Sequence, residues 1–241
     1  MGNQAERGVL FHDRIAAAYD AQLTSRAEDV LARRAFQDLV ARYVPAGSTL
    51  LDFGCGTGLD AFHYASLGYR VLAYDNSPGM IAQLRRNRDH PLIESFSDFP
   101  AEVHYHAVTA NFAVLNHLRD LASWFESISR AEWLFVSVLN PLHWTLLTTP
   151  RRWRSIFSSD LRPHSSLPCI TYLHPVPSIV KAARGFRLIG RANAGAMVRY
   201  RALDEQPLCW RGKRSLKSLA WRTPLRPFLG HFVFLVFRRE T

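Results

Sequence analysis

A glycine-rich segment at residues 50–58, LLDFGCGTG, constrains the fold of this chain more than any other feature. It lies between an apolar stretch at 48–54 that predicts a strand and an amphipathic stretch at 59–68 that predicts a helix. Glycines at such a junction let the chain turn sharply and let the backbone approach a ligand closely. The segment therefore predicts a strand, a ligand-binding turn and a helix, which together open a parallel α/β sheet.

Two aspartates give this turn its chemical character. Asp52 precedes the first glycine by two residues, and Asp75 ends the next expected strand, 23 residues beyond Asp52. A pyrophosphate prefers backbone amides to a nearby carboxylate, so Asp52 disfavours phosphate and suits a ligand with a positively charged amino group. Asp75 is placed to accept hydrogen bonds from ribose hydroxyls. The pair favours a nucleoside that carries a zwitterionic sulfonium amino acid. The alternatives are a plain tight turn for the glycines and a helix N-cap for Asp75.

Three segments resemble motifs of a known family. The segments LLDFGCGTG and VLAYDNSPGMI are similar to the first two motifs of the class I S-adenosylmethionine-dependent methyltransferases. FHDRIAAAYD, at 11–20, resembles a segment of their small-molecule members, including the quinone-biosynthesis type, and TANFAVLNHLRDL, at 109–121, resembles the segment after their fourth strand. The resemblance covers roughly residues 11–140. It implies an enzyme that methylates oxygen, carbon or nitrogen of a small organic acceptor in lipid, quinone-like or specialised-metabolite biosynthesis. S-adenosylmethionine is then the methyl donor and S-adenosylhomocysteine the product.

The resemblance also implies which residues bind the cofactor. They are Tyr19, Asp52, Gly54, Cys55, Gly56, Gly58, Asp75, Asn76, Met80, Ser95 and Asn111. In this assignment Asp52 and the three glycines line the methionine end, Asp75 holds the ribose, and Met80 packs on the adenine. Tyr19 and Asn111 approach the methionine end from the other side.

Plainer roles remain open for some of these residues. Met80 and Tyr19 also suit simple packing, and Asn111 suits an ordinary turn. Family members often carry an aspartate near the position of Ser95, and Phe-Asp where this chain has Tyr105 and His106. The family's aspartate at this position reaches the adenine amine, so it is left open which residue of this chain makes that contact.

The order of strands and helices predicts a Rossmann-like, doubly wound α/β fold. We expect a mostly parallel seven-stranded sheet with helices on both faces, in a single domain of 241 residues. Within it, residues 1–45 form an N-terminal helical segment and 46–140 the cofactor-binding core. Residues 141–177 and 200–229 are expected to be insertions on the substrate side.

Methyl transfer from a sulfonium requires mainly alignment and desolvation, but an oxygen acceptor often needs a general base. His143, which follows the strand expected at 131–140, is the first candidate, and His117 is the second. The alternative for each is a surface or packing role. Aromatic and arginine side chains in 141–177 suit an apolar or anionic acceptor.

The charge is unevenly distributed along the chain. Residues 1–150 carry 12 Lys and Arg against 16 Asp and Glu, a net −4, and residues 151–241 carry 18 against 4, a net +14. An anionic substrate, an anionic membrane surface or nucleic acid each suits the basic part. Leucines among basic residues at 210–222 suit peripheral membrane contact, and a solvated helix is the alternative for this segment. An RNA methyltransferase is an alternative, although no RNA-binding module is recognisable, and DNA is not expected. A non-catalytic cofactor-binding protein is a further alternative.

Targeting and metal signals are weak. No run approaches the roughly 18 apolar residues of a membrane span, and the N-terminus lacks a signal core, so we expect a cytoplasmic protein. The three cysteines, Cys55, Cys169 and Cys209, are scattered and predict neither a disulfide framework nor a metal site.

Overall fold

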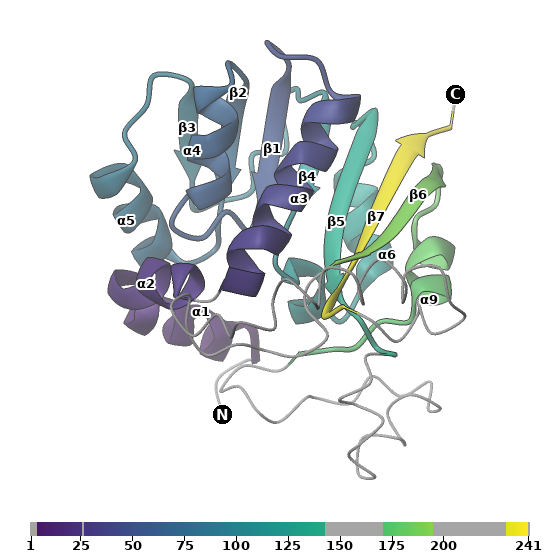
Figure 1. The fold of residues 1–241 in the computed structure, drawn as a ribbon, viewed down its shortest axis with the longest axis horizontal. Coiled ribbons are helices and arrows are strands. Elements are labelled where there is room, and N and C mark those ends of the chain that lie inside the picture. The colour runs from purple at the N-terminus through teal and green to yellow at the C-terminus, as the bar shows by residue number, and fades with distance from the viewer. Residues whose placement is uncertain (1–3, 26, 143–170, 195–229, 241) are drawn as a thin grey trace, which may run out of the picture.

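One mixed sheet organises the computed structural model, which describes residues 4–25, 27–142, 171–194 and 230–240. The strand order is β3-β2-β1-β4-β5-β7-β6 (Figure 1). The strands are β1 (Thr49–Phe53), β2 (Arg70–Tyr74), β3 (Ile93–Phe96), β4 (Ala107–Ala110), β5 (Trp133–Leu139), β6 (Phe186–Ala194) and β7 (Phe232–Arg239). The first five pair in parallel, and β7 runs antiparallel to both β5 and β6. This arrangement confirms the predicted Rossmann-like, mostly parallel seven-stranded sheet.

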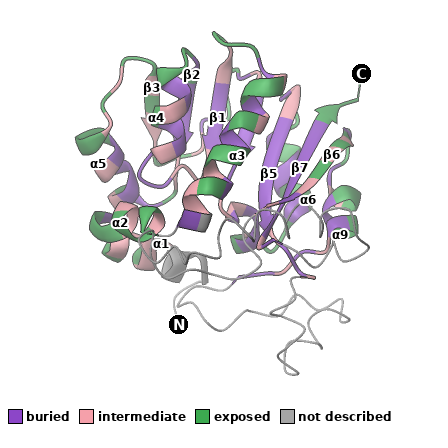
Figure 2. Ribbon diagram, viewed as in Figure 1, coloured by how far each residue is buried: buried purple, intermediate pink, exposed green. Residues whose placement is uncertain are grey.

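Helices cover both faces of this sheet. The helical elements are α1 (Gln4–Ile15), η1 (Ala16–Ala18), α2 (Tyr19–Thr24), α3 (Ala27–Tyr43), α4 (Leu59–Ser66), α5 (Pro78–Asn87), η2 (Val114–His117), α6 (Leu121–Ser127) and α9 (Val176–Ala182). One buried cluster joins the sheet to α3 and α4 through Phe36 and Tyr64. A second joins its other face to α6 and α9 through Phe125 and Ile179. Because both faces are covered, the central strands are continuous apolar runs, and Figure 2 shows them buried.

Strand β3 was not recognised from the sequence. Its four residues, IESF, are only partly buried, so neither a continuous apolar run nor a strict alternation marks them. Parallel pairing of β3 with β2 places it at the edge of the sheet. Short edge strands of this kind are fixed by their neighbour more than by their own residues.

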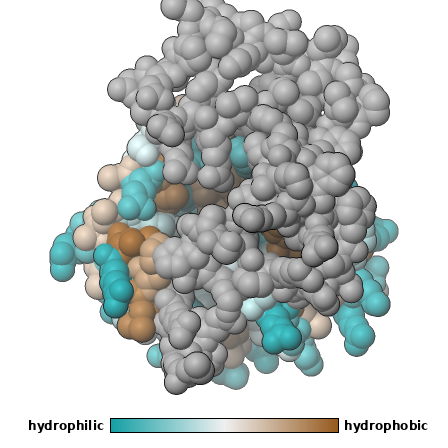
Figure 3. Space-filling model, turned by 90° about the horizontal axis from the view of Figure 1, so that it is seen from below, coloured by the Kyte–Doolittle hydropathy of each residue, from teal (hydrophilic) through white to brown (hydrophobic). Residues whose placement is uncertain are grey.

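The carboxyl ends of the parallel strands meet at one edge of the sheet. Helices α1 and α2 lie beside this edge, at the bottom of Figure 1. Figure 3 views the molecule from that side, where hydrophobic and hydrophilic side chains of the described residues lie next to each other. Open α/β sheets bind their ligands at this edge. Most of the two expected substrate-side insertions lies outside the described residues. Within the described part, no helix is long and apolar enough to cross a membrane.

Candidate active site

A cavity of about 610 Å³ opens at the carboxyl edge of the sheet. Its walls come from the glycine loop, the end of β2, the segment from 111 to 120, and the N-terminal helices. Its volume falls within the range of small-molecule sites, roughly 300–1,000 Å³. The fold therefore brings residues that are far apart in the sequence together around one cavity.

The glycine loop is shaped for a close approach to this cavity. Gly54, Gly56 and Gly58 all have positive φ, at 73°, 55° and 84°. A Cβ atom on Gly54 would lie 2.6 Å from Cγ1 of Val114, a distance too short for any side chain. The amides of Gly54 and Cys55 donate to the carbonyl of Tyr74 at 2.8 and 2.9 Å, which ties the loop to the end of β2. Gly54 and Cys55 line the cavity.

The other two glycines act behind the cavity wall. The amide of Gly56 is turned toward Asp75, and Gly58 is the N-cap of α4. A Cβ on Gly58 would lie 2.7 Å from Cδ1 of Leu84, so this glycine lets α4 and α5 pack closely. Neither glycine is a lining residue of the cavity.

Asp75 lines the cavity with a carboxylate held by two backbone amides. Its Oδ2 accepts from Gly56 N at 2.8 Å, and its Oδ1 accepts from Ser77 N at 2.9 Å. Burial raises the pKa of Asp75, while these two amides oppose the rise. The N-cap of α5 is Ser77, whose side chain accepts from Met80 N at 3.2 Å. Asp75 is therefore not the helix cap, and each of its oxygens keeps a lone pair for a hydroxyl donor.

Asp52, in β1, is not among the residues that line the cavity. It is 2% exposed, and its Oδ1 accepts from the hydroxyl of Thr109 at 2.9 Å. Its Oδ2 is buried without a hydrogen-bond partner among the described residues. Burial, and next the neighbouring Asp60, raise the pKa of Asp52 to about 8. A buried carboxyl of this kind is stabilised in its ionised form by an arriving cation.

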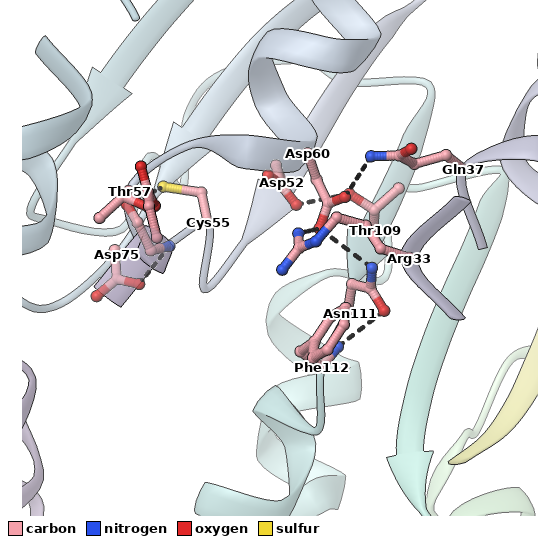
Figure 4. Close-up of polar contacts among 12 residues, drawn as sticks. Arg33, Gln37, Asp52, Cys55, Thr57, Asp60, Asp75, Thr109, Asn111 and Phe112 are labelled. Carbon is pink, nitrogen blue, oxygen red and sulfur yellow. Dashed lines mark hydrogen bonds and ion pairs between the residues drawn. The ribbon is translucent and has the colours of Figure 1, made fainter. Parts of the chain in front are cut away.

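Asp60, in the first turn of α4, organises one wall of the cavity. It forms an ion pair with Arg33 and accepts hydrogen bonds from Gln37 Nε2 at 2.7 Å and Asn111 Nδ2 at 3.1 Å (Figure 4). Arg33 and Asn111 both line the cavity. The sequence placed Asn111 at this site but did not identify Asp60 or Arg33.

The N-terminal helices close the site from below. Tyr19 lines the cavity and packs on the glycine loop, since a Cβ on Gly56 would lie 3.3 Å from its Cε1. Burial raises the pKa of Tyr19 to about 12, which keeps its phenol protonated. Asp20, the next residue, accepts from the hydroxyl of Thr57 and forms an ion pair with Arg88 at 2.6 Å.

A second attachment comes from Asp13, near the end of α1. The Oδ1 atom of Asp13 accepts from Ser77 Oγ at 2.5 Å and from Gly79 N at 2.8 Å. Gly79 permits this contact, because a Cβ there would lie 3.0 Å from Cα of Asp13. The sequence did not assign Asp13 or Asp20 a role, although both stand in the segment FHDRIAAAYD.

The residues expected near the adenine separate into two groups. Met80, which is 1% exposed, and Asn76 line the cavity. Ser95 does not; its Oγ accepts from Arg85 Nε at 2.9 Å, and its carbonyl accepts from Arg85 Nη2 at 2.9 Å. Arg85 thus occupies the polar atoms of Ser95 outside the cavity.

Of the two candidate bases, His117 lines the cavity and His143 lies outside the described residues. His117 ends η2 and is exposed, and its ring meets that of His12 edge to face at 5.7 Å between centroids. His12, on α1, also lines the cavity. The sequence gave no sign of this pairing, because 105 positions separate the two histidines.

The fold and the cavity at the carboxyl edge of its sheet are typical of a class I methyltransferase domain. The sequence profile of a methyltransferase domain family matches residues 21–226. The match covers most of the chain, which therefore belongs to this methyltransferase domain family.

Proteins similar to this chain are named as methyltransferases. The chain is 29% identical over 119 residues to a dTDP-3-amino-3,6-dideoxy-α-D-glucopyranose N,N-dimethyltransferase of Streptomyces fradiae. That match covers 48% of this chain and 47% of the relative, so the chain spans about half the length of this curated relative.

Two solved structures share the fold. One is an S-adenosylmethionine-dependent methyltransferase from Mesorhizobium loti, with a TM-score of 0.55 and 16% identity over 86% of this chain and 96% of that one. The other is the 1,6-didemethyltoxoflavin-N1-methyltransferase of Burkholderia thailandensis, with bound 1,6-didemethyltoxoflavin and S-adenosylhomocysteine. It has a TM-score of 0.60 and 16% identity over 100% of this chain and 92% of that one.

Proposed function

We propose that this protein transfers the methyl group of S-adenosylmethionine to an oxygen, carbon or nitrogen atom of a small organic acceptor. The observation that carries the proposal is the 610 Å³ cavity, which Asp75 enters with a carboxylate oriented by two amides. A carboxylate with free lone pairs at the end of β2 suits the two hydroxyls of a ribose.

The described residues fit this donor. The unpaired Oδ2 of Asp52 lies behind the glycine loop, where the ammonium group of a methionine moiety would stabilise its charge. Met80 and Asn76 line the part of the cavity that follows Asp75 and suit the adenine. When bound, the donor supplies a methyl group activated by a sulfonium.

The protein itself contributes alignment, desolvation and proton transfer. Tyr19 and Leu23 of α2 wall the cavity, so the N-terminal helices limit the access of water to the reacting atoms. His117, an exposed residue of the cavity lining, would accept the proton of an acceptor hydroxyl as the oxygen–methyl bond forms, or the proton that an amine loses after its methylation. His143 stays a prediction, because it lies outside the described residues.

The lining of the cavity favours a small acceptor that is apolar or anionic. Leu118 and the buried Tyr172 add apolar surface to the lining, and the exposed Arg119 adds a positive charge. The relatives act on small molecules according to their names, an amino sugar nucleotide and a toxoflavin precursor. An RNA acceptor stays the alternative, and most of the basic part that favours it lies outside the described residues. Cytoplasmic localisation and peripheral membrane contact stay predictions.

Calorimetric titration with S-adenosylhomocysteine tests the donor site. We expect 1:1 binding, and Asp75→Ala should weaken it by about 10- to 100-fold, since two hydrogen bonds to a charged group are lost. Asp98→Ala, at an exposed carboxylate after β3, is the matched control and should change nothing. Absence of binding to the unaltered protein would refute the proposal. Tight, steeply salt-dependent RNA binding would instead favour an RNA acceptor.

Incubation with labelled donor and a host small-molecule extract then identifies the acceptor. A labelled product of low molecular mass is the expected result. Donor binding without turnover on any extract would support a non-catalytic role.

A further inference from the structure

Part of the cavity wall consists of residues that the methyl donor does not require, and these residues form one connected group. His117 ends η2, and its ring meets that of His12 from α1 at 5.7 Å between centroids. Tyr172 lies beside them, because its amide donates to the carbonyl of Asn116 at 2.6 Å and its carbonyl accepts from Asn116 Nδ2 at 2.6 Å. We call this part the acceptor wall and define it by the lining residues His12, His117, Arg119 and Tyr172.

The acceptor wall is rich in positive and proton-accepting groups. Arg119 is exposed and forms no ion pair within the part of the chain that the structure describes. The imidazoles of His12 and His117 can each accept a proton near neutral pH. Elsewhere in the lining, the charge of Arg33 is paired with Asp60. An acceptor that reaches this wall therefore meets an uncompensated guanidinium and two histidines.

The carboxylates of the described lining, Asp75 and Asp120, are already engaged. Asp75 accepts from two backbone amides and is assigned to the ribose of the donor. Asp120 is the N-cap of α6, where its Oδ1 accepts from the amides of Ala122 and Ser123 at 2.9 and 3.2 Å. Its Oδ2 accepts from the hydroxyl of Ser123 at 2.6 Å, and these bonds hold the pKa of Asp120 below its ordinary value. Asp120 thus serves the helix rather than an acceptor.

This distribution of charge discriminates between acceptor chemistries. An aliphatic amine is an ammonium ion at neutral pH, and it would meet the like charge of Arg119 and no uncommitted carboxylate in the described lining. A phenol must lose its proton to become a strong nucleophile, and a neighbouring cation favours the ionised form. A carboxylic acid arrives ionised and suits the same cation.

We infer that the acceptor is a phenol or a carboxylic acid, whose oxygen receives the methyl group while Arg119 and His12 hold it. The proton of a phenol passes to His117, whereas a carboxylate arrives without one. The oxygen then forms its bond to the methyl carbon as the bond from that carbon to sulfur breaks and leaves its electron pair on sulfur. This inference rests on the proposed function and narrows the acceptor atom from oxygen, carbon or nitrogen to oxygen.

Three small probes that differ in charge test the acceptor wall without turnover. Benzoate, benzamide and benzylammonium have similar apolar bodies and are anionic, neutral and cationic at neutral pH. We titrate each into protein saturated with S-adenosylhomocysteine and follow binding by ligand-observed NMR. Benzoate should bind at least about fivefold more tightly than benzylammonium.

Variants of the wall show whether this preference comes from the assigned residues. Arg119→Gln should weaken the binding of benzoate about three- to tenfold and that of benzamide less than about twofold. His12→Phe, which keeps a ring beside His117 but has no N–H donor, should act in the same direction. Arg86→Gln, at an exposed position of α5 outside the lining, is the matched control and should change neither affinity.

Several results would overturn the inference. They are absence of benzoate binding, binding of benzylammonium as tight as that of benzoate, and unchanged binding of benzoate to Arg119→Gln. Equal weakening of benzoate and benzamide would show that Arg119 only shapes the wall, and would also overturn it. If the unaltered protein does not bind S-adenosylhomocysteine, the proposed function fails and the inference fails with it.

Transfer of a ¹³C-labelled methyl group identifies the acceptor atom directly. The product formed from a host small-molecule extract should carry the label on oxygen, which the ¹³C chemical shift of the methyl group distinguishes from a label on nitrogen or carbon. A methyl group on nitrogen or carbon would overturn this inference and leave the proposed function intact.

Discussion

Burial makes the two carboxyl groups of the donor site behave differently. Asp75 is stabilised as a carboxylate by two amides, whereas Asp52 receives one hydroxyl hydrogen bond and faces Asp60. Asp52 therefore stays protonated at neutral pH until a cation approaches it. The site is thus prepared for a positively charged group at a cost to the stability of the protein.

The raised pKa of Asp52 predicts how the stability of the protein depends on pH. The pKa of Asp52 is about 8 in the folded protein, and that of an aspartate in an unfolded chain is about 3.9. Folding raises this pKa, so the folded protein binds the proton more tightly, and the stability falls as pH rises from about 4 to about 8. Asp52→Asn keeps the acceptor for Thr109 and removes the titration. Its melting temperature at pH 8 should exceed that of the unaltered protein by roughly 5 °C or more, with a smaller difference at pH 5.

Asp52→Asn should also bind S-adenosylhomocysteine about tenfold more weakly, since a neutral amide cannot form an ion pair with the ammonium group of the ligand. A gain in stability with a loss of binding is typical of a functional group that the fold tolerates rather than requires. Asp98→Asn, at an exposed position, provides the control. A difference in melting temperature that stays constant from pH 5 to pH 8 would contradict the assignment of the titration to Asp52.

Gly54 is closely packed against Val114, and this contact leads to a second prediction at the scale of residues. Gly54→Ala places a methyl group against Val114 in a left-handed conformation, with φ of 73°. We expect a loss of about 2–4 kcal/mol of unfolding free energy and no measurable binding of S-adenosylhomocysteine. Gly47→Ala is the matched control, because Gly47 also has positive φ, at 85°, but has nothing within 4 Å of its Cβ position. Chemical denaturation of both variants separates the effect of backbone strain, which both share, from that of the contact with Val114. Equal losses of unfolding free energy would show that Val114 moves aside at little cost.

Local spacing explains which site residues the sequence could predict. Gly54, Cys55 and Asp75 follow from a strand end and a turn, whose geometry is set by neighbouring residues. Arg33 and Asp60 are 27 positions apart, and their pairing depends on how α3 and α4 pack. No local pattern marks such a pair, so it becomes visible only in the folded chain.

At the scale of elements, charged and polar contacts attach α1 and α2 to the donor site. Asp13 holds α1 to the start of α5, and Asp20 holds α2 to the glycine loop and to Arg88. The same segment supplies His12 and Tyr19 to the cavity wall. A ligand enclosed in this way should leave only when these helices move.

Loosening α2 should therefore accelerate product release. Asp20→Asn removes the charge that pairs with Arg88, and we expect S-adenosylhomocysteine to dissociate about tenfold faster in stopped-flow displacement. Asp38→Asn, at an exposed position on α3, is the control. An unchanged dissociation rate would show that the ligand leaves without displacement of α2.

Elements with strong periodicity were predicted, and weakly patterned elements were not. The strands β1, β2, β5 and β7 are apolar runs bounded by turn residues, which is typical of buried strands. β3 has a half-exposed sequence and depends on β2 for its position. The N-terminal helices were expected, but their docking depends on Asp13, Asp20 and their distant partners.

At the scale of the whole molecule, the sheet joins the two ends of the described chain. β7, near the C-terminus, lies between β5 and β6, so it completes the sheet begun by β1. The cavity likewise draws on α1 at one end and on Tyr172 beyond β5. This arrangement favours one cooperative unit, and the single domain expected from the sequence stays a prediction.

A thermal scan with and without S-adenosylhomocysteine tests this cooperativity. At a concentration about 100 times the dissociation constant, a ligand that binds only the folded state adds about 2.7 kcal/mol, which for a chain of this size raises the melting temperature by roughly 5–10 °C. Because the cavity uses α1, the glycine loop and Tyr172, the whole transition should shift as one. At the same ligand concentration Asp75→Ala, which should bind about 10- to 100-fold more weakly, should reduce the shift to about half or less. Two transitions, of which the ligand moves only one, would show that part of the chain unfolds independently of the donor site. Calorimetry distinguishes these cases, since a single two-state transition has equal calorimetric and van't Hoff enthalpies.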